Sequence, residues 1–193
     1  YYAGVTYPPA IASSQAVGRL IAVRMLFYGF LCFTSLALAL FSAVVWCGAG
    51  HGDASAQMCW LGLLGLSFAL RVCYPFIQML ALNSGNLAYI LENTMAAFGL
   101  FCATRTVCLI CLARGALAER ILCGIAAGFV VLALVFSAWM TTALPAFSPV
   151  YGRILFWYKA LIAGALTLLV IRRMWRQASV QTLLLLSGLL VYT

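Results

Sequence analysis

The sequence predicts an all-α fold, a polytopic transmembrane helical bundle of about six spans. Hydrophobic residues make up 66% of the 193 residues and charged residues only 7%, a composition that no soluble domain of this size shows. The apolar residues also fall in long runs. Several runs exceed the roughly 20 residues that a helix needs to cross the hydrocarbon core of a bilayer.

The first residues are polar and read as extended chain. Pro8-Pro9 and Ser13-Ser14 both disfavour a helix. We interpret residues 1–17 as an extracytoplasmic tether that leads from a sensory domain outside this sequence. Residues 18–193 then form the transmembrane module, truncated at the carboxyl terminus.

Three spans are expected in the first part of the module. The first runs from about Ile21 to Trp46 and is followed by a short loop, Cys47 to Gln57. The second, Met58 to Leu82, and the third, Leu87 to Leu112, are joined by the polar turn Asn83 to Asn86. We therefore expect the second and third spans to form a helical hairpin.

Prolines divide the remaining apolar sequence. The fourth span is expected at about Ile121 to Met140 and the fifth at Arg153 to Ile171, with Pro145 and Pro149 breaking the helix between them. A sixth span starts near Val180 and is still apolar where the sequence stops.

Small residues are spaced for close helix contact at two places. Gly124 and Gly128 form a Gly-x-x-x-Gly in the fourth span, a weak signal that more often reflects packing alone. A strip of small side chains follows the third span at helical spacing: Ala88, Ala96, Gly99 and Ala103. Such faces permit a homodimer without requiring one.

Basic residues in the short connections predict the orientation. With the amino terminus outside, the inner connections and segment ends carry five arginines: Arg114, Arg120, Arg172, Arg173 and Arg176. The outer ends carry Arg19 and Arg153. Because basic residues stay on the cytoplasmic side, we expect the amino terminus outside.

Three of the few charges fall inside the predicted hairpin, at Arg71, Glu92 and Arg105. A charge in the bilayer interior costs at least about 2.5 kcal/mol, so it needs a partner. Counted from the turn near position 84, Arg71 lies thirteen residues back and Glu92 eight forward, a difference in depth of roughly 7 Å. A long arginine side chain spans that distance. We predict an Arg71–Glu92 ion pair that acts either as a switch or as a structural staple.

The other cations are expected at the membrane interfaces. Arg105 lies roughly 20 Å beyond Glu92 along the same helix, close enough to Leu112 to extend toward the far interface. Lys159 follows the aromatic start of the fifth span, and an interfacial position is favoured there over a buried ligand contact. The basic group that ends the fifth span is Arg172, Arg173 and Arg176.

Several functional classes are excluded by what the sequence lacks. The spacing of Cys108 and Cys111 suits a metal, but His51 is the only histidine and the cysteines lie mostly in apolar segments, so we expect no metal or cofactor. Too few carboxylates are present for an acid and base site. The net charge of +8 is scattered over single positions and segment ends, which favours contact with the lipid bilayer and excludes a nucleic-acid surface.

Short motifs occur in a characteristic order along the chain. They are Tyr7-Pro8-Pro9, the run Cys59 to Leu66 leading into Ala69-Leu70-Arg71, Ile90-Leu91-Glu92, Phe156-Trp157-Tyr158, Arg172 to Arg176, and Leu183 to Leu186. In this order they resemble the bacterial seven-transmembrane receptors with diverse intracellular signalling modules. The resemblance covers nearly the whole chain, up to a sixth span.

The resemblance implies a function for the chain as a receptor module without catalytic residues of its own. It would relay a signal from an extracytoplasmic sensory domain to a cytoplasmic output domain, a histidine kinase, diguanylate cyclase or phosphatase, in the bacterial inner membrane. The alternative is a small transporter or channel in which four charges, Arg71, Glu92, Arg105 and Lys159, line an anion or proton path. Against it, the sequence has no visible internal repeat.

Overall fold

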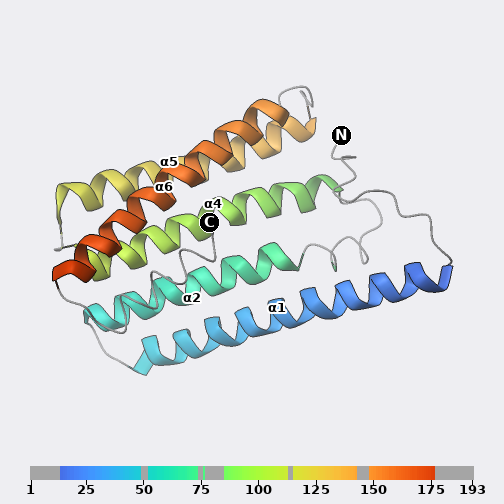
Figure 1. Ribbon diagram of the computed structural model, residues 1–193, viewed down its shortest axis with the longest axis horizontal. Helices are drawn as coiled ribbons and strands as arrows, with labels where there is room; N and C mark the ends of the chain where they lie inside the picture. The colour runs from blue at the N-terminus through green and yellow to red at the C-terminus, as the bar shows by residue number, and fades with distance from the viewer. Residues whose placement is uncertain are drawn as a thin grey trace.

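The computed structural model describes residues 14–48, 52–73, 76, 85–112, 115–142 and 148–176, and this part of the chain is helical without a strand. Its long helices are α1 (Ser14–Gly48), α2 (Asp53–Val72), α4 (Gly85–Cys111), α5 (Leu117–Thr142) and α6 (Ser148–Arg176) (Figure 1). Each of these five described helices is long and apolar enough to cross a membrane. The all-α prediction is confirmed, and the chain is a multi-pass membrane protein.

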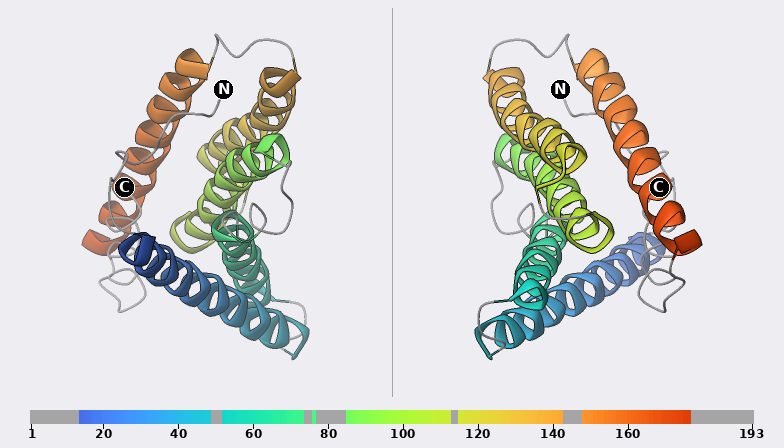
Figure 2. Two further views of the ribbon diagram at one scale, coloured as in Figure 1. Left: turned by 90° about the vertical axis from the view of Figure 1, so that its right-hand side faces the viewer. Right: turned by 90° about the vertical axis from the view of Figure 1, so that its left-hand side faces the viewer.

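Helices that are neighbours in the sequence are neighbours in space for most of the bundle. Helix α1 packs on α2, α2 on α4 and α4 on α5, whereas α6 turns back to contact both α4 and α5. Figure 1 shows α1, α4 and α6 running in one direction and α2 and α5 in the other. The end-on views of Figure 2 place α4 between α2 and α5. Helix α4 is therefore the helix that most of the bundle contacts.

Small side chains bring α1 and α2 close together. A Cβ added to Gly65 would lie 3.0 Å from the backbone oxygen of Ser35, and one added to Gly62 would lie 3.2 Å from Ser42 Cβ. Close backbone approach through small residues is how helices associate in lipid, where no hydrophobic force drives them together. The rest of α1 exposes large apolar side chains, as a lipid-facing helix does.

Helix α6 is held by larger side chains. Its buried face, Tyr158, Ile162, Leu166 and Val170, joins Leu100 and Val107 of α4 in one apolar cluster. The ring of Tyr158 stacks on Phe129 of α5, with centroids 3.6 Å apart and planes 9° from parallel. Aromatic stacking therefore connects α5 to α6 where small residues connect α1 to α2.

The second span differs from its predicted bounds. Helix α2 begins at Asp53 and ends at Val72, ten residues before the predicted end at Leu82. The N–H of Cys73 closes the helix on the carbonyl of Ala69. Pro75 supplies the physical reason, because a proline removes a helical donor and disfavours helical geometry in the residue before it.

The fifth span is also longer than predicted. Helix α6 begins at Ser148, so Pro149 falls in its first turn, where a missing N–H breaks no helical hydrogen bond. At the other end the helix continues to Arg176, past the predicted end at Ile171. The predicted tether before Ser14 and the sixth span from Val180 lie outside the described residues.

The Gly-x-x-x-Gly of the fourth span faces outward. A Cβ added to Gly124 or Gly128 would meet nothing within 4 Å in the described part of the chain. Helix α5 therefore does not pack closely on another described helix through Gly124 and Gly128. The pair of glycines offers a matched control for Gly65.

We expect Gly65→Val to destabilise the bundle, because the added methyl groups would meet the backbone of α1 and push α1 and α2 apart. Overpacking of this kind lowers the free energy of unfolding by about 1–3 kcal/mol. Unfolding in mixed detergent micelles, followed by circular dichroism, measures the difference. Gly124→Val makes the same change of residue type at an open position, and equal losses for the two variants would contradict the α1–α2 packing.

Candidate functional site

Two charged side chains on α4 organise the polar interior of the bundle. Glu92 and Arg105 lie thirteen residues apart, which is about 20 Å along a helix. Each belongs to a separate group of residues. We call them the Arg105 cluster (Trp60, Arg105, Gly115, Glu119 and Cys123) and the Glu92 cluster (Arg71, Glu92 and Lys159).

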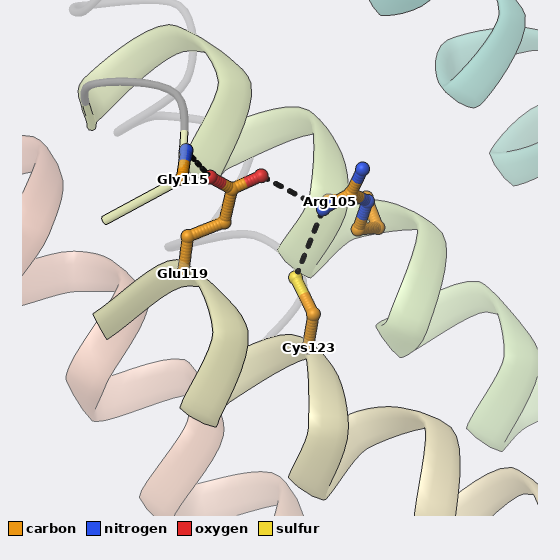
Figure 3. Close-up of polar contacts among 4 residues, drawn as sticks. All are labelled: Arg105, Gly115, Glu119 and Cys123. Atoms are coloured by element: carbon orange, nitrogen blue, oxygen red, sulfur yellow. Dashed lines mark hydrogen bonds and ion pairs between the residues drawn. The ribbon is translucent and has the colours of Figure 1, made fainter. Parts of the chain in front are cut away.

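The Arg105 cluster joins three helices around one guanidinium group. Arg105 Nη1 donates a hydrogen bond of 2.8 Å to Glu119 Oε1 and a weaker one of 3.7 Å to Cys123 Sγ, both on α5 (Figure 3). The guanidinium carbon also lies 5.5 Å from the ring centre of Trp60 on α2, within cation–π range. Arg105 is therefore bound from two sides.

The carboxylate of Glu119 is held in place by its own surroundings. Its second oxygen, Oε2, accepts the backbone N–H of Gly115 at 2.9 Å (Figure 3). Gly115 has φ 78°, a left-handed conformation that glycine adopts without strain. Glu119 also lies in the first turn of α5, where the helix dipole favours a negative charge. The turn, α4 and α5 are thus fixed by one side chain.

The sequence named no partner for Arg105 and predicted only that its side chain extends toward the far interface. Arg105 lies seven residues before Leu112 and Glu119 seven residues after it. Residues at equal distances on either side of a short connection lie at equal depth, so the same count that was applied to the turn near position 84 predicts the Arg105–Glu119 pair. Arg105 pairs with Glu119 in the first turn of α5, at the end of the spans toward which its side chain was expected to extend.

The Glu92 cluster is defined by the register of α2 against α4. A Cβ added to Gly99 would lie 2.9 Å from Ser67 Oγ, so Ser67 and Gly99 face each other. Because the two helices are antiparallel, Arg71, one turn after Ser67, lies opposite residue 95. Glu92, on the same face as Gly99, lies about 5 Å beyond that level. Arg71 and Glu92 therefore face the same interface at nearly the same depth.

Lys159 joins this cluster from α6. It lies at helical spacing with Ala163, Leu166 and Val170, all buried, and is itself half-buried. Helix α6 packs on α4, the helix that carries Glu92. The structure thus directs Lys159 into the bundle, whereas the sequence favoured an interfacial position. The aromatic residues near it, which suggested the interface, also occur on a helix that packs by aromatic stacking.

The predicted Arg71–Glu92 ion pair stays a prediction. Within the described ranges, no ion pair joins the three members of the Glu92 cluster, in contrast to Arg105 and Glu119. The depth count behind the prediction assumed a helix as far as Leu82, but α2 ends at Val72. What the structure adds is a third charge, which gives the cluster two cations and one carboxylate.

The remaining predicted residues lie away from both clusters. Arg172, Arg173 and Arg176 occupy the last two turns of α6, where the helix dipole favours cations, and Arg172 and Arg176 are exposed. All eight cysteines are free thiols. In the ranges that the structure describes, no group of three or more His, Cys, Asp or Glu side chains is placed to hold a metal ion.

Comparison of the chain with protein-family models, with curated protein sequences and with solved structures gives no match. The two clusters and the helices that carry them are therefore the features of this chain that bear on its function.

We expect Glu119→Gln to destabilise the bundle by about 1–3 kcal/mol, because it leaves the half-buried Arg105 without its carboxylate. Detergent unfolding followed by circular dichroism measures the loss. Arg120→Gln removes an exposed charge from the same turn of α5 and should change stability little. If Arg105→Gln and the double variant lose no more than Glu119→Gln alone, the two side chains act as a unit. Additive losses would contradict the pair.

Proposed function

We propose that this chain is the transmembrane module of a signal-transduction receptor in the bacterial inner membrane. It relays a signal from an extracytoplasmic sensory domain to a cytoplasmic output domain of the histidine kinase, diguanylate cyclase or phosphatase type. The relay is a conformational change in the bundle, and the chain itself carries no catalytic residues. A homodimer of modules is compatible with this role.

One observation carries the proposal: Glu92 and Arg71 face the same interface between α4 and α2, and Lys159 lies on the buried face of α6, which also contacts α4. A single carboxylate shared by two cations has two favourable partners. A receptor needs two arrangements of its helices, each with contacts that the other lacks. Exchange of Glu92 between Arg71 and Lys159 would supply them.

The packing of the helices suits such an exchange. Helices α2 and α4 meet through small residues, Ser67 and Gly99, so their separation is fixed by close contact. Helix α6 packs on α4 through an apolar cluster and on α5 through the stacked rings of Phe129 and Tyr158. A shift of α6 relative to α2 and α4 therefore moves Lys159 with respect to Glu92 and leaves the Arg105 cluster intact.

The same cluster also supports the alternative, a small transporter or channel. Helices α2, α4 and α6 each contribute one charged residue to the Glu92 cluster, and charges in membrane spans often mark ion pathways. A measurement of anion or proton flux distinguishes the two functions. Proteoliposomes that carry the full-length protein and conduct anions or protons, at a rate that Glu92→Gln abolishes, would favour transport.

The relay requires the amino terminus of α1 outside. We expect an alkaline phosphatase fused after residue 145 to be active and one fused after residue 115 to be inactive, because the enzyme folds only outside the cytoplasm. A green fluorescent protein at the same two positions should show the reverse pattern. Phosphatase activity of the fusion at residue 115 would indicate the opposite orientation and would contradict the proposed relay.

We expect Glu92→Gln to change the basal output of the full-length protein by about tenfold, a shift of 1.4 kcal/mol between two arrangements. The readout is phosphorylation or cyclic dinucleotide formation by the output domain, corrected for the amount of protein in the membrane. Arg153→Gln removes an exposed charge from α6 and serves as the control. Unchanged output with normal expression of Glu92→Gln would reject the exchange.

A further inference from the structure

The carboxyl-terminal end of α6 is strongly basic. Its last five residues, Arg172 to Arg176, contain three arginines, and the whole helix contains no Asp or Glu. In the described part of the chain no ion pair reaches these arginines, whereas Arg105 is paired with Glu119. Like charges three or four positions apart on a helix repel each other. The three arginines therefore favour an anion beside them.

Contacts with the neighbouring helices fix the depth of these arginines. Tyr158 stacks on Phe129 of the antiparallel helix α5, so residues twelve positions from each, Val170 and Leu117, lie at nearly the same level. Val170 also belongs to the apolar cluster that contacts Cys111, the last residue of α4. The arginines follow Val170 by two to six residues, so they lie about 3–9 Å beyond the first residue of α5.

The chain reverses direction at this level, between α4 and α5. Leu112 and Gly115 are not helical, and Gly115 is exposed. Non-helical backbone does not occur exposed to lipid inside the hydrocarbon core, because its polar groups would have no partners there. The connection between α4 and α5 therefore lies at the level of the phospholipid headgroups. Figure 1 shows that α6 ends at the same end of the bundle, so its arginines lie at that level too.

Two of the arginines continue the face of α6 that points away from the bundle. Arg172 and Arg176 are exposed and lie four positions apart, so they are neighbours on one side of the helix. Leu168 and Leu161 follow on the same side and are 69% and 71% exposed. Between them, a Cβ added to Gly164 would meet nothing within 4 Å in the described chain. The strip from Arg172 to Leu161 is about 16 Å long, close to half of the roughly 30 Å hydrocarbon core.

We propose that Arg172 and Arg176 bind an anionic phospholipid, with its phosphodiester group at the two guanidinium groups and its acyl chains along Leu168 and Leu161. A guanidinium group can bind two phosphate oxygens at once. The lipid is anionic because a zwitterionic headgroup would bring a further cation to an end of α6 that has no carboxylate. Trp175, which is 87% exposed, lies at the same level, where tryptophan rings are favoured.

The lipid site goes beyond the signalling relay and does not rest on it. It requires only that this end of α6 lies at a membrane surface, which holds for either orientation of the bundle. Its test measures lipid contact without any output, so a failed relay and an absent lipid site give different results.

Trp175 provides the measurement, because it is next to Arg176 and one turn from Arg172. Full-length protein is reconstituted in equimolar vesicles of dioleoyl phosphatidylglycerol and dioleoyl phosphatidylcholine, with bromine on the acyl chains of one lipid or the other. Bromine quenches tryptophan fluorescence only at short range. We expect phosphatidylglycerol to be preferred at Trp175 by about tenfold, since each basic residue near an anionic surface contributes about fivefold. The fluorescence that Trp175→Phe removes isolates this signal.

A second tryptophan of α6 is the control for the reporter. Trp157 is 64% exposed and lies fifteen residues before Arg172. Its signal, isolated by Trp157→Phe, should be quenched equally by the two brominated lipids.

Arginine variants assign the preference to the site. Arg172→Gln and Arg176→Gln should each lower the preference at Trp175 about fivefold. Arg120→Gln removes the same charge from an exposed position on α5, at the same end of the bundle, and should leave the preference unchanged. All three side chains are exposed, so the variants should fold, and circular dichroism checks that they do.

Three results would overturn the site. Equal quenching of Trp175 by the two brominated lipids would show no preference for an anionic headgroup. Weak quenching by both would show that another part of the full-length protein covers the arginines. An equal loss of preference in Arg120→Gln and Arg172→Gln would assign the preference to the charge of the whole surface.

Discussion

The requirement that charge inside a membrane bundle be neutralised governs the polar contacts of this protein. Helix α4 places a carboxylate near one end and a guanidinium about 20 Å away, and both face other helices. At Arg105 the requirement is met by Glu119 and by the ring of Trp60. The Glu92 cluster counts two cations and one carboxylate, and none of its members is joined to another by an ion pair in the described part of the chain. The charged residues near the two ends of α4 therefore make different kinds of contact.

The apolar contacts divide the bundle in a corresponding way. Glycines at 62, 65 and 99 let α1, α2 and α4 approach at backbone distance, and such contacts tolerate almost no displacement. Between α5 and α6 the contacts are stacked rings, such as Phe129 on Tyr158. A Cβ added to the glycines of α5 or α6 (Gly124, Gly128, Gly152 and Gly164) would meet nothing within 4 Å in the described part of the chain, so backbone contact through glycine does not hold these helices. A rearrangement that keeps the first group intact must move α6, the helix that carries Lys159.

Much of the fold could be predicted from the sequence, because a membrane span needs only length and apolar composition. The all-α fold, α4 and α5 follow from that rule, and α2 departs from it where Pro75 ends the helix early. The partners of the charged residues were harder to predict. Arg105 and Lys159 were both assigned to an interface, because composition near a charge cannot show which way its side chain points. That direction depends on register, which the contact of Ser67 with Gly99 reveals only in three dimensions.

The contrast between the clusters argues for separate roles. A neutral, hydrogen-bonded pair such as Arg105 and Glu119, with Glu119 also bound to the turn at Gly115, gains nothing from exchanging partners. Its contribution is to fix α4 against α5. In the proposed relay Glu92 is different, because one carboxylate cannot pair fully with Arg71 and Lys159 at once, and a small displacement changes which contact is favoured. In the proposed relay the Glu92 cluster is the end that responds to a signal, and α4 connects it to the fixed contact at Arg105.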